Sequence, residues 1–301
     1  MSRVLHFFLT SKPYSYASEM TRSLAFYLVL TGDTRFESLL AVSIQTLALW
    51  LYFNWQSDRI QSDPGRIRPP LMIILSAAIV GIWIGYAMGG VWGVGGALVY
   101  IATICAYPLK ARSPFWGPLG PVLRLLTQLG GFVMICGLSK VFPDVVAFSI
   151  AVALSVWLLI RNLVGDVRDV RTDVYELPAR YGTGITKWAI RVGLLVTGII
   201  LWLALSSESK PAILSLSVVA LMFAVLEMLY VVYAIEPYKW GYVGHRFMVM
   251  VTVVLNLVIS LMYGLPVEWL LIMIFLTITL QYCYKFLPGK RFPSLPELLT
   301  K

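Results

Sequence analysis

Long apolar runs separated by short polar connections form the main pattern along this chain. A helix that crosses a bilayer needs roughly 20 mostly apolar residues. Runs of this kind predict ten membrane-spanning helices, near residues 17–31, 36–53, 71–88, 91–107, 119–138, 143–161, 186–206, 211–235, 246–263 and 266–284. The first run is the most polar, because Glu19 and Arg22 lie in its opening turn. A transmembrane barrel would show short segments of alternating polarity instead, so we expect an all-α bundle.

The composition also indicates a membrane protein. Of the 301 residues, 59% are hydrophobic and 13% are charged, and the mean hydropathy is +0.80. A soluble domain of this size could not cover such a sequence with polar surface. Residues 1–17 contain Lys12 and Pro13 and lack the apolar core of a cleavable signal, so we expect the first span to act as an uncleaved anchor. The three cysteines lie within predicted spans, where we expect small core residues rather than a disulfide framework or a zinc site: Cys105, Cys136 and Cys283.

Basic residues are concentrated on one side of this predicted topology. The net charge is +9, which by itself would be compatible with a nucleic-acid partner. Most of the lysines and arginines, however, lie at the two termini and in or beside the connections 54–70, 108–118, 162–185 and 236–245. The opposite connections hold only Arg35, Lys140 and Lys210. This positive-inside pattern predicts a multi-pass protein with both termini and the long connections in the cytoplasm, an even number of spans, and no nucleic-acid partner.

Polar residues gather in the cytoplasmic connections, and no Gly/Ser-rich linker divides the chain. We therefore expect a single domain, residues 1–301, in which nine to ten helices surround a central cavity that opens to the cytoplasmic side. Function normally lies where polar groups concentrate against a membrane core. That criterion selects the segments that follow the second and sixth predicted spans. The sequence does not indicate the oligomeric state.

Both of these segments carry asparagine and aspartate at helical spacing. After the second span, Asn54 and Asp58 are four residues apart and share a helix face. Asp63 precedes Pro64, just beyond the expected end of that helix. After the sixth span, such side chains recur at steps of four, three and four residues, which forms one continuous stripe on a helix. The members of this stripe are Asn162, Asp166, Asp169 and Asp173.

Carboxylates on one stripe repel each other, so another group must offset their charge. For the second segment alone, local ion pairs with Arg168 and Arg171 at a solvated helix end would be enough. Taken together, however, the two segments end matching spans on the same side and can face one cavity. Hard oxygen ligands suit Mg²⁺, and paired metal-bound clusters can clamp a pyrophosphate, so we predict a Mg²⁺–diphosphate site. Nearby cations that suit the same anion are Arg66, Arg68, Lys110 and Arg161.

Three short motifs stand at corresponding ends of predicted spans. The first is Asn54…Asp58-Arg59…Arg68-Pro69, after the second span. The second is Tyr107-Pro-Leu109-Lys110-Ala-Arg112, between the fourth and fifth spans. The third is Asp166-Val-Arg-Asp169-Val-Arg-Thr-Asp173, followed by Leu177-Pro-Ala-Arg180-Tyr-Gly182. In order, spacing and span position these motifs resemble the UbiA superfamily of intramembrane prenyltransferases, and the resemblance extends over residues 15–285.

This chain departs from the family pattern in several places. Trp55 stands where the family usually has an aspartate directly after the asparagine. Ser62 occupies the position of the last usual aspartate of the first motif, although Asp63 is adjacent. The connection between Asp173 and Leu177 is shorter than in the family, and ten spans are one more than the typical nine. The first metal cluster is therefore expected to be thinner, and the loop that helps to select the acceptor is altered.

The resemblance implies Mg²⁺-dependent transfer of a prenyl group from an isoprenoid diphosphate to an unidentified aromatic or lipid acceptor, with the isoprenoid tail in an apolar tunnel between helices. The implied metal ligands are Asn54, Asp58, Asp63, Asn162, Asp166, Asp169 and Asp173. Among them, the implied catalytic carboxylates are Asp58, Asp166, Asp169 and Asp173. The implied diphosphate-binding residues are Asn54, Arg68, Lys110, Arg161 and Asn162.

Other polar and aromatic residues have two interpretations each. Arg124 and Gln128, one turn apart in the fifth span, would be costly against lipid, so they either reach the cavity or make structural hydrogen bonds. Aromatic side chains near the first two motifs either shelter an allylic cation or anchor the helices at the bilayer interface. These aromatic residues are Trp50, Tyr52, Trp55 and Tyr107. The sequence shows no evident general base for an acceptor.

Two alternatives to a prenyltransferase remain open. A terpene cyclase of the same superfamily would keep the ionisation step and let a double bond of the substrate's own chain attack the cation. The altered first motif and the short connection after Asp173 keep this alternative open. A transporter or membrane assembly factor is the alternative without catalysis. Transporters often carry repeated halves and interrupted helices, and the sequence shows no second copy of either acidic segment.

Overall fold

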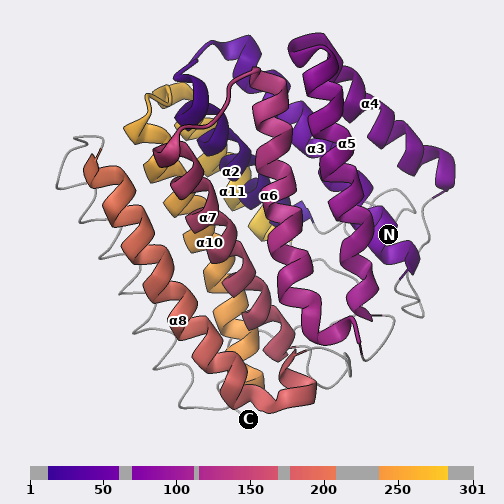
Figure 1. The fold of residues 1–301 in the computed structure, drawn as a ribbon, viewed down its shortest axis with the longest axis vertical. Helices are drawn as coiled ribbons and strands as arrows, with labels where there is room; N and C mark the ends of the chain where they lie inside the picture. Colours follow the sequence, from indigo (N-terminus) through magenta and orange to yellow (C-terminus); the bar gives the residue numbers. More distant parts are fainter. Residues whose placement is uncertain (1–12, 61–69, 112–114, 169–176, 208–236, 284–301) are drawn as a thin grey trace. The chain divides into compact units, whose positions relative to one another are not determined.

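The computed structural model of the chain describes residues 13–60, 70–111, 115–168, 177–207 and 237–283. Within these ranges the chain forms helices and no strand, which confirms the predicted all-α class (Figure 1). The α-helices are α2 (Pro13–Thr31), α3 (Phe36–Ile60), α4 (Leu71–Gly89), α5 (Val91–Ala106), α6 (Gly120–Ser139), α7 (Val145–Arg168), α8 (Leu177–Ser207), α10 (Pro237–Met262) and α11 (Val267–Cys283). Two 3-10 helices, η1 (Tyr107–Ala111) and η2 (Gly117–Leu119), lie between α5 and α6.

Each predicted span corresponds to one of these helices, except 211–235, which lies outside the described residues. Within the described chain, six stretches are long and apolar enough to cross a bilayer, judged by length and composition. They are Phe36–Gln56, Leu71–Gly89, Val91–Lys110, Gly117–Ser139, Val145–Val167 and Leu177–Ser207. The protein is therefore an integral membrane protein. The count of ten spans and the cytoplasmic position of the termini stay predictions.

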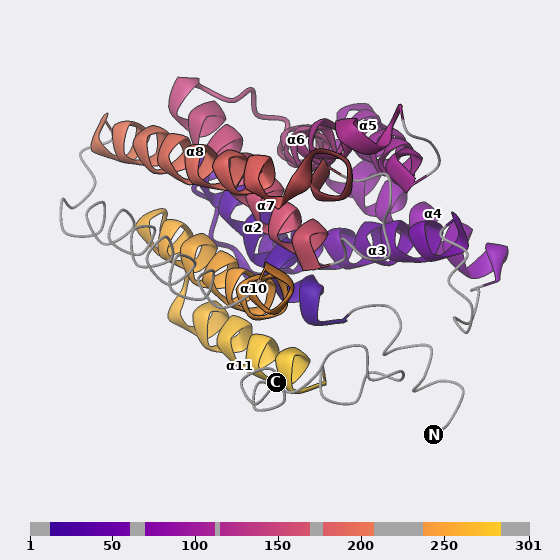
Figure 2. The same cartoon turned by 90° about the horizontal axis from the view of Figure 1, so that it is seen from below.

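Contacts divide the chain into two compact units. The first unit comprises Met1–Pro108, Leu126–Phe148 and Val253–Pro288, and the second comprises Leu109–Leu125, Ser149–Thr252 and Gly289–Lys301. In the first unit, α3 packs against α2 and α4, α4 against α5, and α2 against α11 (Figure 1). In the second unit, α8 packs closely against α7 (Figure 2). A Cβ atom added at Gly193 of α8 would lie only 2.8 Å from Ile160 Cδ1 of α7. The predicted single domain over residues 1–301 stays a prediction.

Glycine allows the backbones of α4, α5 and α6 to touch within the first unit. A Cβ atom at Gly85 on α4 would lie 2.7 Å from the carbonyl oxygen of Gly93 on α5. A Cβ atom at Gly96 on α5 would lie 2.9 Å from the carbonyl oxygen of Val133 on α6. Helices in a membrane associate by such close packing, because lipid tails are as apolar as the side chains that they replace. The glycines at these positions therefore permit the close backbone contacts between the three helices.

The start of α8 lies before the predicted span 186–206. The helical stretch begins at Leu177 and is interrupted at Gly182, which has φ +84° and ψ 157°. Glycine adopts this left-handed backbone conformation without the steric cost that a side chain adds. The short segment before Gly182 carries the Leu177–Gly182 motif, so the kink separates the motif from the apolar body of α8.

Asp33, in the connection between α2 and α3, accepts hydrogen bonds from residues before and after it in the chain. Its Oδ1 atom accepts a hydrogen bond from Arg35 Nε at 2.9 Å, and its Oδ2 atom accepts from Arg35 Nη2 at 3.0 Å and from the Tyr27 hydroxyl at 2.8 Å. The hydrogen bonds from the Arg35 side chain hold the pKa of the Asp33 carboxyl well below its usual range. The charged carboxylate is therefore favoured in the folded state.

Replacing Asp33 with asparagine is expected to lower the stability of the detergent-solubilised protein at pH 6 by up to about 1 kcal/mol, because Arg35 is exposed and water screens the pair. A lowered folded-state pKa contributes stability that is complete above the unfolded carboxyl pKa of about 3.9 and is lost as the pH falls toward the folded value. The melting temperatures of the two proteins should therefore converge between pH 4 and pH 2. A difference that stays constant over this range would show that the carboxylate charge is not its source.

Candidate functional site

The last turns of α7 carry the described part of the second acidic segment. Arg161 is buried there, with 3% of its surface exposed, and Asn162 and Asp166 are half-buried. Asn162 and Asp166 are four residues apart in a continuous helix, so they share one face as predicted. Asp169 and Asp173 lie outside the described residues, and their place on the same stripe stays a prediction.

Lys110 of the middle motif lies against this segment within the second unit. Its Nζ atom is 3.4 Å from Asp166 Oδ1, and the two side chains are 7% and 14% exposed. Lys110 belongs to η1, which directly follows α5. Pro108 explains why the α-helix ends there, because proline has no backbone N–H for the next α-helical hydrogen bond. The middle motif and the second acidic segment, which are far apart in the sequence, therefore meet in space.

The aliphatic part of Lys110 lies on the first residue of α6. A Cβ atom at Gly120 would be 3.2 Å from Lys110 Cδ, so the absence of a side chain at Gly120 leaves the space that the lysine occupies. A buried ammonium group is stable only with a counter-charge, and Asp166 supplies one. The Lys110 ammonium is thus held at a defined place near the end of α7.

Asn162 adds an unsatisfied polar atom to this site. Its Nδ2 atom is buried and has no hydrogen-bond partner among the residues that the structure describes. Buried amide donors are nearly always bonded, so such an atom indicates a ligand or an ordered water. An asparagine amide can donate to a phosphate oxygen through Nδ2 and ligate a hard cation through Oδ1. The donor set of Lys110, Arg161, Asn162 and Asp166 therefore fits a phosphate group with a divalent cation.

The first acidic segment lies on the last turns of α3, in the first unit. Asn54 is 2% exposed, and its Nδ2 atom donates to the carbonyl oxygen of Trp50 at 3.0 Å, which fixes the orientation of the amide. The α3 helix continues to Ile60, so Asp58 lies one helical turn after Asn54, as the spacing predicted. Asp63 and Arg68 lie outside the described residues.

The aromatic residues beside Asn54 have structural contacts. Trp50 Nε1 donates to Ser15 Oγ on α2 at 3.1 Å, and the Tyr52 hydroxyl lies 3.2 Å from Cys105 Sγ. Trp50, Tyr52 and Trp55 are all buried. Both interpretations of these residues, as anchors at the bilayer interface and as shelter for an allylic cation, stay predictions. The prediction that Cys105 is a core residue is wrong, because that position of α5 is exposed.

Several polar and charged residues of α2 and α6 are buried inside the protein. Arg124 and Gln128 on α6 are 6% and 1% exposed, so neither faces lipid. Glu19 and Arg22 on α2 form a buried ion pair that the sequence interpretation missed. Their opposite charges at a spacing of three residues were the available signal. In the described part of the chain, no group of three or more His, Cys, Asp or Glu side chains could hold a metal ion on its own.

Comparison with solved structures identifies the architecture. No protein-family model and no curated protein sequence matches the chain. A structure of digeranylgeranylglyceryl phosphate synthase matches 87% of this chain and 99% of its own length, with a TM-score of 0.62 and 15% identity. A UbiA homologue from Archaeoglobus fulgidus bound to GPP and Mg²⁺ matches over 85% and 99% of the two chains, with a TM-score of 0.62 and 10% identity.

A UbiA homologue from Aeropyrum pernix K1 matches over 87% of this chain and 98% of its own, with a TM-score of 0.58 and 11% identity. The chain has the UbiA fold. The resemblance carried by the three sequence motifs is thereby confirmed at the level of the fold. Since nearly the whole length of each UbiA structure is matched, the likeness covers the complete architecture and not one helical hairpin.

Proposed function

We propose that this UbiA-fold protein is an intramembrane prenyltransferase that ionises an isoprenoid diphosphate and transfers the prenyl group to a hydrophobic acceptor. The observation that carries the proposal is the Lys110–Asp166 contact at the end of α7, where buried Arg161 and half-buried Asn162 precede Asp166 on the same helix. Two cations, an amide and a carboxylate at the end of a membrane helix suit a diphosphate with its metal ion. The solved UbiA homologues from Archaeoglobus fulgidus bound to GPP and Mg²⁺, and to DMAPP and Mg²⁺, support this choice of ligands.

The reaction places its largest charge change on the diphosphate. The allylic carbon–oxygen bond breaks, and both of its electrons leave with the diphosphate. The acceptor then forms a bond to the allylic carbon and loses a proton. Fixed cations that face the departing oxygens stabilise this charge, because they need no reorganisation during the step. In our proposal, Lys110, Arg161 and Arg68 bind the phosphate oxygens.

Mg²⁺ would add Lewis-acid stabilisation of the same oxygens when bound. The residues proposed to hold it are Asn162, Asp166, Asp169 and Asp173 of the second segment, and Asn54, Asp58 and Asp63 of the first. Asp166 pairs with Lys110 in the described structure. A carboxylate that ligates a cation has less charge left for a lysine, so Lys110 would then be available to the diphosphate.

Purified protein in lipid nanodiscs is expected to release pyrophosphate from geranylgeranyl diphosphate when Mg²⁺ and an acceptor are present. Chelation of the metal with EDTA should reduce the rate by 100-fold or more, on the order of the loss of one major electrostatic group. Restoring Mg²⁺ in excess should recover it. Release that is insensitive to EDTA, or no release with prenyl diphosphates of any length tested with a panel of aromatic and lipid acceptors, would contradict the proposal.

A terpene cyclase is the second candidate, because Trp55 is buried directly after Asn54 where the family usually has an aspartate. A metal cluster with fewer carboxylate ligands and an aromatic side chain beside it suit a cation that rearranges before it is quenched. Product analysis separates the two functions. Cyclic hydrocarbons formed without an acceptor would favour the cyclase, and turnover that requires an acceptor would favour the transferase.

A further inference from the structure

The contact between Lys110 and Asp166 joins two side chains that the proposed function assigns to different ligands. Lys110 is assigned to the diphosphate, and Asp166 is assigned to the divalent cation. In the structure the Lys110 ammonium faces the Asp166 carboxylate, with Nζ 3.4 Å from Oδ1. The carboxylate thus takes up charge of the lysine that a phosphate would use, and the lysine takes up charge of the carboxylate that a cation would use.

Both charged groups of this pair are buried, so the loss of either partner is costly. The side chains of Lys110 and Asp166 are 7% and 14% exposed. Removing one partner of a buried ion pair leaves the other charge without compensation. An anion that took Lys110 alone would leave the Asp166 carboxylate without the lysine charge and beside a second negative charge. The pair therefore opposes the binding of a diphosphate that arrives without a cation.

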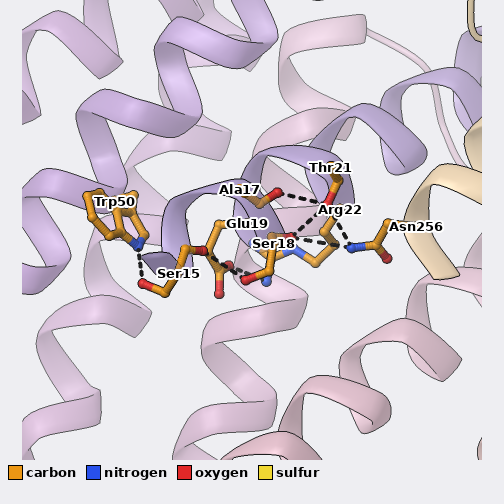
Figure 3. Close-up of polar contacts among 8 residues, drawn as sticks. All are labelled: Ser15, Ala17, Ser18, Glu19, Thr21, Arg22, Trp50 and Asn256. Atoms are coloured by element: carbon orange, nitrogen blue, oxygen red, sulfur yellow. Dashed lines mark hydrogen bonds and ion pairs between the residues drawn. The ribbon is translucent and has the colours of Figure 1, made fainter. Parts of the chain in front are cut away.

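The distance within the pair is long for two opposite charges. Charge-assisted N–H···O bonds are usually about 2.7–2.9 Å long. The buried pair of α2 has such a distance, because Arg22 Nη1 lies 2.8 Å from Glu19 Oε2 (Figure 3). Lys110 Nζ, at 3.4 Å from Asp166 Oδ1, is farther from its carboxylate. A cation that ligates Asp166 can therefore replace the lysine without the loss of a short, strong bond.

Only the end of the Lys110 side chain has to move in this exchange. Its stem lies along the first residue of α6, because a Cβ atom at Gly120 would be 3.2 Å from Lys110 Cδ and 3.5 Å from Lys110 Cβ. Asn162 lies roughly 6 Å before Asp166 along the axis of α7. Its buried Nδ2 atom has no hydrogen-bond partner among the described residues. A phosphate that accepts from Asn162 would thus be near the released ammonium.

We infer that Asp166 is an internal counter-ion that keeps Lys110 from the diphosphate until a divalent cation neutralises the carboxylate, an inference that rests on the proposed function. Lys110 is not among the proposed metal ligands, and it nevertheless contributes to the metal requirement. Each ligand removes the partner that opposes the other, so the two bind cooperatively and their coupling is reciprocal. The pair thereby disfavours a complex in which the diphosphate is bound without the cation that its ionisation requires.

Binding of inorganic pyrophosphate in EDTA tests this inference without turnover. Equilibrium dialysis of radiolabelled pyrophosphate against the protein in nanodiscs gives the Kd. Asp166→Asn keeps the shape of the side chain and removes its charge, so this variant should bind about tenfold more tightly than the wild type, the effect of releasing one charge-assisted hydrogen bond. Glu37→Gln removes an exposed carboxylate from the first turn of α3, and its Kd should stay within about twofold of the wild type. An unchanged Kd in Asp166→Asn would overturn the inference.

A double-mutant cycle separates the release of Lys110 from a general loss of negative charge. In the Lys110→Met background no ammonium is left to release, so adding Asp166→Asn should change the Kd for pyrophosphate in EDTA by no more than about threefold. The coupling between the two positions is then the difference between the two backgrounds. The same tenfold gain in both backgrounds would show that Asp166 only repels the anion, and it would overturn the inference.

The affinity for a divalent cation gives a second test, which does not require Asp166→Asn to fold. Mn²⁺ binding is followed by electron paramagnetic resonance in the absence of any phosphate compound. Lys110→Met should bind Mn²⁺ at least about fivefold more tightly than the wild type, the lower end of typical coupling between sites, because the lysine no longer competes for Asp166. Equal Mn²⁺ affinities would overturn the inference. Failure of the proposed function would appear separately, as wild-type protein that releases no pyrophosphate from prenyl diphosphates with Mg²⁺ and an acceptor.

Discussion

Replacing Lys110 with methionine is expected to lower kcat/KM for pyrophosphate release by at least about 100-fold, the typical effect of removing one preorganised group that stabilises transition-state charge. Methionine keeps the unbranched stem that lies on Gly120 and removes only the ammonium group. The measurement is the initial rate of release against prenyl diphosphate concentration. Since the lost interaction is strongest when charge develops on the leaving group, kcat should fall along with kcat/KM.

Controls separate this effect from misfolding. Lys110→Met leaves Asp166 without its described counter-charge, so the double variant Lys110→Met/Asp166→Asn removes both charges and should recover thermal stability without recovering activity. Lys187→Met on α8 removes a lysine of the same unit that has no part in the proposed site, and its rate should stay within about threefold of the wild type. Near-normal kcat/KM in the Lys110 variant would remove the main support for the proposed function.

The sequence predicted the helices well because a bilayer demands long apolar runs. The apolar runs alone stop near residues 53 and 161, whereas α3 and α7 extend to Ile60 and Arg168, as the helical spacing of their polar residues predicted. An apolar run reports the thickness of the bilayer, but a helix continues for as long as its backbone hydrogen bonds can form. These polar extensions carry Asn54 and Asp58, and Asn162 and Asp166, at the spacing that the sequence indicated.

The positions of individual side chains were harder to predict. Lipid and protein interior are both apolar, so hydrophobicity does not tell a core position from a lipid-facing one, and Cys105 was wrongly placed for that reason. Glu19 and Arg22 looked like the polar start of a weak span, and they are buried because neighbouring helices such as α6 cover them. Such coverage depends on tertiary packing that no local pattern encodes. The sequence assigned Lys110 and Asp166 to one predicted diphosphate site, but it did not indicate that the two side chains are in direct contact.

Changing Gly93 to alanine is expected to destabilise the first unit by about 1–3 kcal/mol, the usual cost of an added methyl group in a tightly packed core, or by more. The new Cβ atom would overlap the carbonyl oxygen of Gly85 on α4. That oxygen belongs to a helix backbone and cannot rotate away as a side chain would, so α4 and α5 must separate. The separation also weakens the dispersion contacts along both helices. Thermal unfolding in detergent, followed by circular dichroism, measures the loss.

Gly95 provides the matched control on the same helix. A Cβ atom there meets no atom within 4 Å, so Gly95→Ala adds the same methyl group without an overlap. Alanine is the better helix former by about 1 kcal/mol, and this control should be as stable as the wild type or slightly more stable. Equal melting temperatures for the two variants would show that the contact between α4 and α5 is not tight. A loss confined to Gly93→Ala would show that backbone contact, rather than side-chain packing, determines the spacing of these helices.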